Sequence, residues 1–288
     1  MYPTITIGST ELSSYNLFFA LGAIGLLIYS LRTRKKYDLS LLRATFYSIF
    51  LVAAGLYEFK IMGAIQSYFI ELKSNGEVIL GGSSRIFGVL IFQPIMIYIL
   101  SLFTGDKFRK IADFIAPGTL ICFVFGKFAC FLEGCCHGLP DENGVFSHIA
   151  EQNVFPVQLY ESLSVIPAVV ILTILLYKSN KLRMGSLFPI GGILYCIPRM
   201  FWENYRYYDN IYQADFFFKL NFWQFFCIIA IVMYVVWLIL LYRMPKFAAC
   251  SLDNRHKPIV EFISKINIST KHVTAKNTKK PTQNKKKK

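Results

Sequence analysis

Apolar positions along the chain fall into long runs, which recur from about residue 14 to residue 242. Each run is close to the ~20 residues that a helix needs to cross the hydrocarbon core of a bilayer. The pattern predicts an all-α integral membrane protein with about seven transmembrane helices, while six or eight spans stay open. The predicted spans are residues 14–31, 41–57, 86–103, 113–132, 157–177, 186–202 and 220–242.

Basic residues are distributed very unevenly over the segments between these runs. Of the 31 Lys and Arg, 24 lie in residues 32–43, 104–110, 178–183 and 243–288, and the segments that alternate with these hold four. Because Lys and Arg near span ends are kept on the cytoplasmic side, we expect the N-terminus outside and the C-terminus in the cytoplasm. No Lys or Arg precedes the first run, so we expect a retained helix and not a cleaved signal peptide.

Composition agrees with a membrane protein, because 55% of the 288 residues are hydrophobic and the mean hydropathy is +0.45. We expect a transmembrane bundle with small extracytoplasmic loops at residues 1–242 and a basic, disordered cytoplasmic tail at residues 243–288. Most of the net charge of +14 lies in the tail and the cytoplasmic loops. This placement favours attraction to anionic lipid headgroups over binding of nucleic acid.

Charged side chains inside the runs are the first functional candidates, because each costs ~2.5–3.5 kcal/mol at the centre of a membrane helix. One face of the sixth span carries four polar side chains at ~100° per residue. They are Tyr195, Arg199, Glu203 and Arg206. Two interpretations stay open. The guanidinium groups bind a phosphate headgroup, or Arg199 and Glu203 neutralise each other while Arg206 extends to the interface.

Two further charges lie near the outer ends of the fourth and fifth spans. Lys127 either joins the arginines as a second clamp on phosphate or extends outward as an anchor. Glu161 is either a helix cap or a counter-ion. The role of both residues therefore depends, like that of the sixth-span face, on whether a phosphate headgroup binds here.

The adjacent pair Cys135 and Cys136 follows the fourth span and precedes His137. Zinc sites favour two cysteines separated by two to four residues, so this spacing predicts tight turn packing and no metal. We expect no cofactor.

Several motifs occur in a fixed order along residues 14–242. They are Asp113 with Pro117, Gly126-Lys127 through Gly138-Leu139-Pro140, Pro156 through Glu161, Gly185, and Tyr195, Arg199, Glu203, Arg206 and Asp209. In this order they resemble the bacterial prolipoprotein diacylglyceryl transferase family. The resemblance is to its divergent members, whose fourth span ends in a Gly-Cys-Cys-x-Gly stretch.

The resemblance implies a multi-pass enzyme of the bacterial inner membrane. Such an enzyme moves the diacylglyceryl group of phosphatidylglycerol to the lipobox cysteine thiol of a prolipoprotein signal peptide and releases glycerol phosphate. It implies a catalytic set of Arg199, Glu203, Arg206 and Tyr195. It implies substrate binding by Lys127, Cys130, Gly138, Asp113, Gln158, Tyr160 and Glu161.

The sequence departs from the family pattern at five positions. Lys127 stands where an arginine is usual, Cys130 where an asparagine is usual, and Cys135 where a glutamate is usual. Ile86 occupies the nearest position to the third-span histidine, and Phe155 replaces another histidine. His137 and His148 are the outward-facing histidines available as a base.

Two other functions stay open at this point. One is a catalytically silent relative that binds anionic phospholipid or escorts a partner. The other is a transferase of the same fold that uses a different thiol or amine acceptor.

Overall fold

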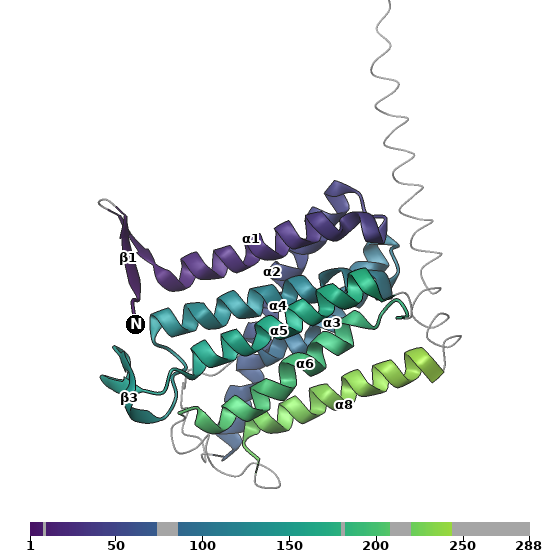
Figure 1. The fold of residues 1–288 in the computed structure, drawn as a ribbon. Coiled ribbons are helices and arrows are strands. Elements are labelled where there is room, and N and C mark those ends of the chain that lie inside the picture. The colour runs from purple at the N-terminus through teal and green to yellow at the C-terminus, as the bar shows by residue number, and fades with distance from the viewer. Residues whose placement is uncertain (8–9, 74–85, 180–181, 208–219, 244–288) are drawn as a thin grey trace, which may run out of the picture.

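The computed structural model describes residues 1–7, 10–73, 86–179, 182–207 and 220–243. Long helices lie alongside one another in a bundle, with two small β-hairpins at one end (Figure 1). The helices are α1 (Ser14–Thr33), η1 (Arg34–Tyr37), α2 (Leu41–Lys73), α3 (Phe87–Thr104), α4 (Phe108–Glu133), α5 (Val157–Lys178), α6 (Leu187–Trp202), η2 (Glu203–Tyr205) and α8 (Phe222–Arg243). The antiparallel hairpins pair β1 (Thr4–Ile7) with β2 (Thr10–Ser13), and β3 (Pro140–Ser147) with β4 (Gln152–Val154).

Helices form at each predicted span, and the chain is an all-α integral membrane protein. Within the described residues, six helices are long and apolar enough to cross a membrane: α1 to α5 and α8. The sixth predicted span forms α6, whose 16 residues extend for ~24 Å and fall short of the ~30 Å hydrocarbon core. A seventh crossing and the orientation stay predictions. The tail at residues 244–288 and the loop at residues 74–85 lie outside the described residues.

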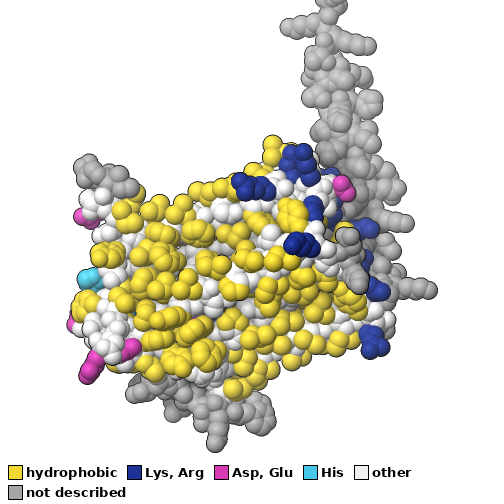
Figure 2. All heavy atoms as spheres, in the orientation of Figure 1, with side chains coloured by type: hydrophobic (Ala, Val, Ile, Leu, Met, Phe, Trp, Pro, Cys, Tyr) yellow, Lys and Arg dark blue, Asp and Glu magenta, His cyan; other side chains and the backbone are white. Residues whose placement is uncertain are grey.

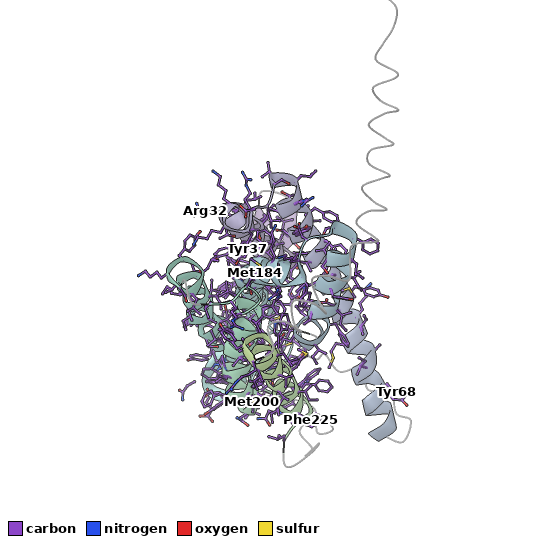
Figure 3. All side chains as sticks on the ribbon, turned by 90° about the vertical axis from the view of Figure 1, so that its right-hand side faces the viewer. Arg32, Tyr37, Tyr68, Met184, Met200 and Phe225 are labelled. Carbon is purple, nitrogen blue, oxygen red and sulfur yellow. The ribbon has the colours of Figure 1, made fainter. Side chains whose placement is uncertain are left out.

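The predicted end of the second span at residue 57 is wrong, because α2 continues to Lys73. Glu58, one residue beyond that predicted end, lies inside α2, where the helix packs against α3 and the side chain is fully buried. Gly88 of α3 permits this close approach, since a Cβ there would lie 2.2 Å from the Glu58 carbonyl oxygen. Figure 3 shows the far end of α2, at Tyr68, standing apart from the other helices.

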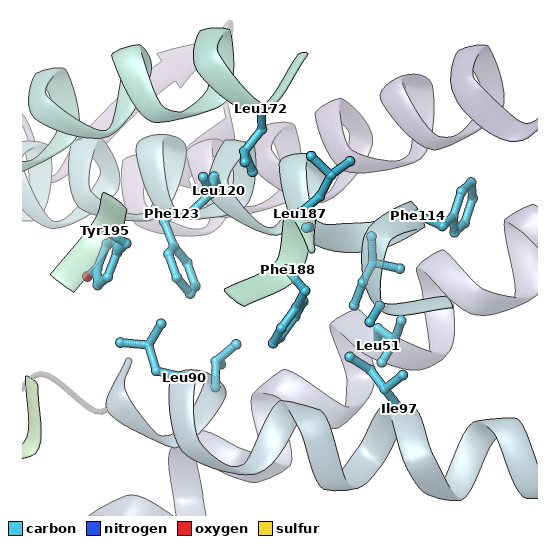
Figure 4. Close-up of a cluster of buried hydrophobic side chains, with 14 of the residues drawn as sticks. Leu51, Leu90, Ile97, Phe114, Leu120, Phe123, Leu172, Leu187, Phe188 and Tyr195 are labelled. Atoms are coloured by element: carbon cyan, nitrogen blue, oxygen red, sulfur yellow. The ribbon is translucent and has the colours of Figure 1, made fainter. Parts of the chain in front are cut away.

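The core lies around α4, which packs against α1, α3, α5 and α6. Side chains from several helices meet there, among them Leu90, Leu120, Leu172 and Phe188 (Figure 4). The outer surface between the two ends of the bundle is largely apolar in Figure 2. Lys and Arg gather at one end of this face, while acidic side chains and a histidine lie at the end that carries the hairpins.

Candidate active site

Glu161, near the start of α5, is the centre of a buried cluster of charges. Lys127 Nζ from α4 lies 2.8 Å from Glu161 Oε2, and Arg206 Nη2 lies 2.5 Å from the same oxygen. Arg199 Nη1 from α6 donates to Glu161 Oε1. Glu161 is therefore a counter-ion that joins cations from three parts of the chain.

Glu203 is the second carboxylate of the cluster. Its Oε2 lies 2.5 Å from Arg199 Nη1 and 3.9 Å from Arg206 Nε. The cluster thus combines three cations with two carboxylates and keeps one net positive charge among the described residues. Each of these side chains is at most 4% exposed, so water screens their interactions little.

The predicted helical face of the sixth span ends earlier than expected. The α-helix ends at Trp202, Glu203 lies in the 3₁₀ turn η2, and Arg206 has an extended backbone. Arg206 still returns to the cluster, because its Nη1 also donates to the Cys136 carbonyl oxygen at 3.0 Å. Its side chain is 2% exposed, so the interpretation in which Arg206 extends to the interface is wrong.

A cavity of about 760 Å³ lies beside the cluster, between α1, α2, α3 and α4. Its wall is mainly apolar, and its volume is in the usual range of ligand pockets. Of the three cations in the cluster, Lys127 lines this cavity among the residues that the structure describes. Glu133 also lines it, although sequence reasoning did not select Glu133; its place at the end of a span, beside cysteines, was the available signal.

A tight turn follows α4 and brings three thiols together. Gly134 caps the helix with a φ of 85°, and Cys136 also has a positive φ, of 56°. As a result, the sulfur atoms of Cys130, Cys135 and Cys136 lie within 4.8 Å of one another. The neighbouring thiols and the nearby cations hold the pKa of Cys136 well below its usual value, while its thiol neighbours and burial raise the pKa of Cys135.

Gln158 and Gly138 hold this turn in place. Gln158 Nε2 donates to the Cys135 carbonyl oxygen at 2.7 Å, and the Gly138 N–H donates to the Phe155 carbonyl oxygen at 3.0 Å. A Cβ at Gly138 would lie 2.5 Å from that Phe155 oxygen, so a larger residue there would displace the turn. The two predicted residues therefore act on the site through the backbone.

Tyr195 lies deeper in the bundle, at 2% exposure. Its ring packs on Phe123 with centroids 4.8 Å apart, and Phe123 lines the cavity. The structure thus places Tyr195 behind the cavity wall.

Two predicted substrate-binding residues are not brought to the cluster. Asp113 lies 14 positions before Lys127, or ~21 Å along α4. It accepts hydrogen bonds from the N–H groups of Gly185, just before α6, and of Leu187, the first residue of α6. Its role is to cap that helix. Tyr160 is 39% exposed and stacks on Phe155 and Trp202 at the surface.

The two outward-facing histidines are also separate from the cluster. His137 stacks on Tyr207 with centroids 5.4 Å apart, and His148 contacts the edge of the Phe146 ring. Ile86, at the predicted place of the third-span histidine, lines the cavity.

Comparisons with known proteins bear on this site. A family model described as prolipoprotein diacylglyceryl transferase matches residues 3–240. The phosphatidylglycerol–prolipoprotein diacylglyceryl transferase of Dehalococcoides mccartyi is 26% identical over 205 residues, which cover 68% of this chain and 78% of that protein. Proteins with the same name from Bacillus velezensis and Listeria innocua are 31% identical over 194 residues and 25% identical over 226 residues. They cover 63% and 74% of this chain, and 69% and 80% of those proteins.

Proposed function

Because the chain belongs to the prolipoprotein diacylglyceryl transferase family, we propose that it moves the diacylglyceryl group of phosphatidylglycerol to the lipobox cysteine of prolipoproteins. One observation carries this proposal: a buried cluster with a net positive charge borders a mainly apolar cavity of about 760 Å³. An anionic headgroup attached to acyl chains needs both of these surroundings next to each other. The site lies in a multi-pass protein of the bacterial inner membrane.

Lys127 is the residue that meets the phosphate of the bound lipid, because it belongs to both the cluster and the cavity wall. Arg199 and Arg206 lie on the side of Lys127 away from the cavity and share its counter-ion, Glu161. Their positive charge stabilises the phosphate as it leaves, in a site that excludes most water. The two glutamates fix the guanidinium groups, so little rearrangement is needed during the reaction.

The acyl chains occupy the apolar part of the cavity, along residues such as Leu26, Leu51 and Val89. The end of the bundle with the hairpins faces outward, since the basic helix ends gather at the opposite end. A secreted precursor then meets the cluster from the side on which its lipobox is presented.

The reaction joins a sulfur atom to carbon. The thiolate of the lipobox cysteine attacks the glycerol carbon of the diacylglyceryl group, and the bond from that carbon to the phosphate oxygen breaks. The electron pair leaves on this oxygen, and glycerol phosphate is released.

The test is transfer in vesicles that contain phosphatidylglycerol labelled in its diacylglyceryl group, together with a lipobox peptide. We expect label on the cysteine peptide, release of glycerol phosphate, and no label on a matched serine peptide. Lipid binding without transfer to any acceptor would instead support the silent relative. Label on an amine or on a thiol outside a lipobox would support the acceptor-divergent transferase.

A further inference from the structure

The turn that carries Cys135 and Cys136 is held under backbone strain. Cys136 has a φ of 56°, in the left-handed region that residues with a side chain rarely adopt. Two buried donors hold the turn: Arg206 Nη1 bonds the Cys136 carbonyl oxygen, and Gln158 Nε2 bonds the Cys135 carbonyl oxygen. The arrangement of the thiols is therefore set by the rest of the site.

The fold brings a third sulfur donor, that of Cys130, close to the two adjacent cysteines. The sequence spacing of Cys135 and Cys136 predicted no zinc, but the turn folds both residues back toward Cys130. Sulfur atoms around a tetrahedral zinc ion are ~3.8 Å apart, given a Zn–S distance of ~2.3 Å. The three sulfurs lie within 4.8 Å of one another, which is close enough for one ion to contact all three after a small adjustment of the side chains.

A set of three thiolates suits a soft ion such as Zn²⁺ and leaves one of four positions open. Three protein ligands with an open position are typical of catalytic zinc sites, whereas structural sites fill all four positions. All three cysteines line the cavity proposed for the lipid, so the open position is accessible from the place of the reaction.

The surrounding charges suit such an ion. Zn²⁺ with three thiolates carries a net charge of −1, which becomes −2 when a fourth thiolate binds. Lys127 lies one helical turn before Cys130, and Arg206 is bonded to the backbone of Cys136. These cations offset the negative charge without competing for the metal.

We propose that Cys130, Cys135 and Cys136 bind a zinc ion whose open position takes the thiol of the acceptor cysteine, an inference that rests on the proposed function. On binding, the thiol loses its proton to water, and the metal holds the resulting thiolate. The thiolate sulfur then attacks the glycerol carbon, and the electron pair of the broken bond leaves on the phosphate oxygen. The thioether product is a weaker ligand and leaves the ion. The metal thus activates the thiol without a basic side chain.

The first test is the zinc content of the protein purified in mild detergent. We expect stoichiometric zinc in the wild type and its loss in Cys130→Ser, Cys135→Ser and Cys136→Ser. Cys122→Ser is the matched control, because Cys122 lines the same cavity on α4 and bonds the Gly22 carbonyl oxygen, as a serine also can. Equal zinc in all four variants would overturn the proposal, as would a disulfide between any two of the three cysteines.

The second test uses the wild type loaded with Co²⁺ and does not depend on the folding of a variant. Binding of a lipobox peptide should increase the thiolate-to-cobalt charge-transfer absorption, whereas its serine counterpart should leave the spectrum unchanged. No response to the cysteine peptide would overturn the role of the open position.

The two proposals fail in different ways. Diacylglyceryl transfer by metal-free protein would overturn the zinc inference and leave the proposed function standing. A cobalt response to the cysteine peptide without transfer from phosphatidylglycerol would reject the proposed function and leave the metal site standing.

Discussion

Glu161 and Glu58 are both buried carboxyl groups in membrane-spanning helices, but their surroundings are opposite. Glu161, in α5, contacts Lys127, Arg199 and Arg206. Glu58, in α2, is 0% exposed, and neither of its oxygens accepts a hydrogen bond from a residue that the structure describes. Burial by itself therefore does not show whether a carboxylate has cations around it.

The comparison shows how the charge of each carboxyl group contributes to stability. A buried carboxylate is costly unless cations and hydrogen-bond donors surround it, and Glu161 has both. Removing its charge leaves cations uncompensated. Removing the carboxyl group of Glu58 leaves no described cation behind, so the two sites should respond very differently to the same substitution.

The largest effect should come from Glu161→Gln. This variant keeps the shape of the side chain but removes the charge shared by Lys127, Arg199 and Arg206. Because breaking a buried ion pair leaves unpaired charge, we expect the free energy of unfolding to fall by ~3–5 kcal/mol. Thermal unfolding in detergent measures this, and a midpoint equal to that of the wild type would contradict the account of the cluster.

Arg199→Lys should have the next largest effect, and it should fall on activity. Lysine keeps the positive charge but cannot contact Glu161 and Glu203 with a planar guanidinium group. We expect transfer to the lipobox peptide to fall by ~10²-fold or more, while the protein still inserts and folds.

The control for this substitution is Arg43→Lys, because the Arg43 side chain is 54% exposed at the other end of the bundle. Near-normal transfer by Arg199→Lys, at matched expression, would exclude the proposed role of the Arg199 guanidinium group in the reaction. Transfer that falls equally in both variants would point to a general effect on expression or folding.

The positions of the helices follow from hydropathy, because a membrane span must be apolar over a fixed length. The predicted spans at residues 86–103, 157–177 and 220–242 differ by one or two residues from α3, α5 and α8. The end of α2 could not be predicted in this way. Hydropathy counts Glu58 as polar wherever its side chain points, and here it faces the neighbouring helices.

The site itself was predictable only in part. Helical spacing brought Arg199 and Glu203 together, and they do pair. It could not show that Glu161 joins cations from separate helices, or that Asp113 caps α6, because both depend on packing between segments distant in sequence. The three-sulfur group was also hidden, since it forms only when Gly134 reverses the chain.

Asp113→Asn extends the comparison to a buried carboxylate that is compensated by backbone donors. Asp113 accepts hydrogen bonds from the N–H groups of Gly185 at 2.6 Å and Leu187 at 2.8 Å. Asparagine has one acceptor oxygen, which leaves one of these buried N–H groups without an acceptor, so we expect a loss of ~1–2 kcal/mol in the free energy of unfolding. Transfer per folded molecule should be unchanged. A selective loss of transfer would instead support the original prediction that Asp113 binds substrate.

Glu58→Gln should have the smallest effect of the four substitutions. A fully buried carboxyl group without a described cation or donor avoids the cost of burying a charge when it keeps its proton. Glutamine has nearly the same shape and is also neutral, so we expect a change within ~0.5 kcal/mol in the free energy of unfolding and little change in transfer. Infrared difference spectra should contain the carbonyl stretch of a protonated carboxylic acid that Glu58→Gln removes. If that band is missing, or if Glu58→Gln folds but no longer transfers, then Glu58 carries a charge that the reaction uses and its contrast with Glu161 fails.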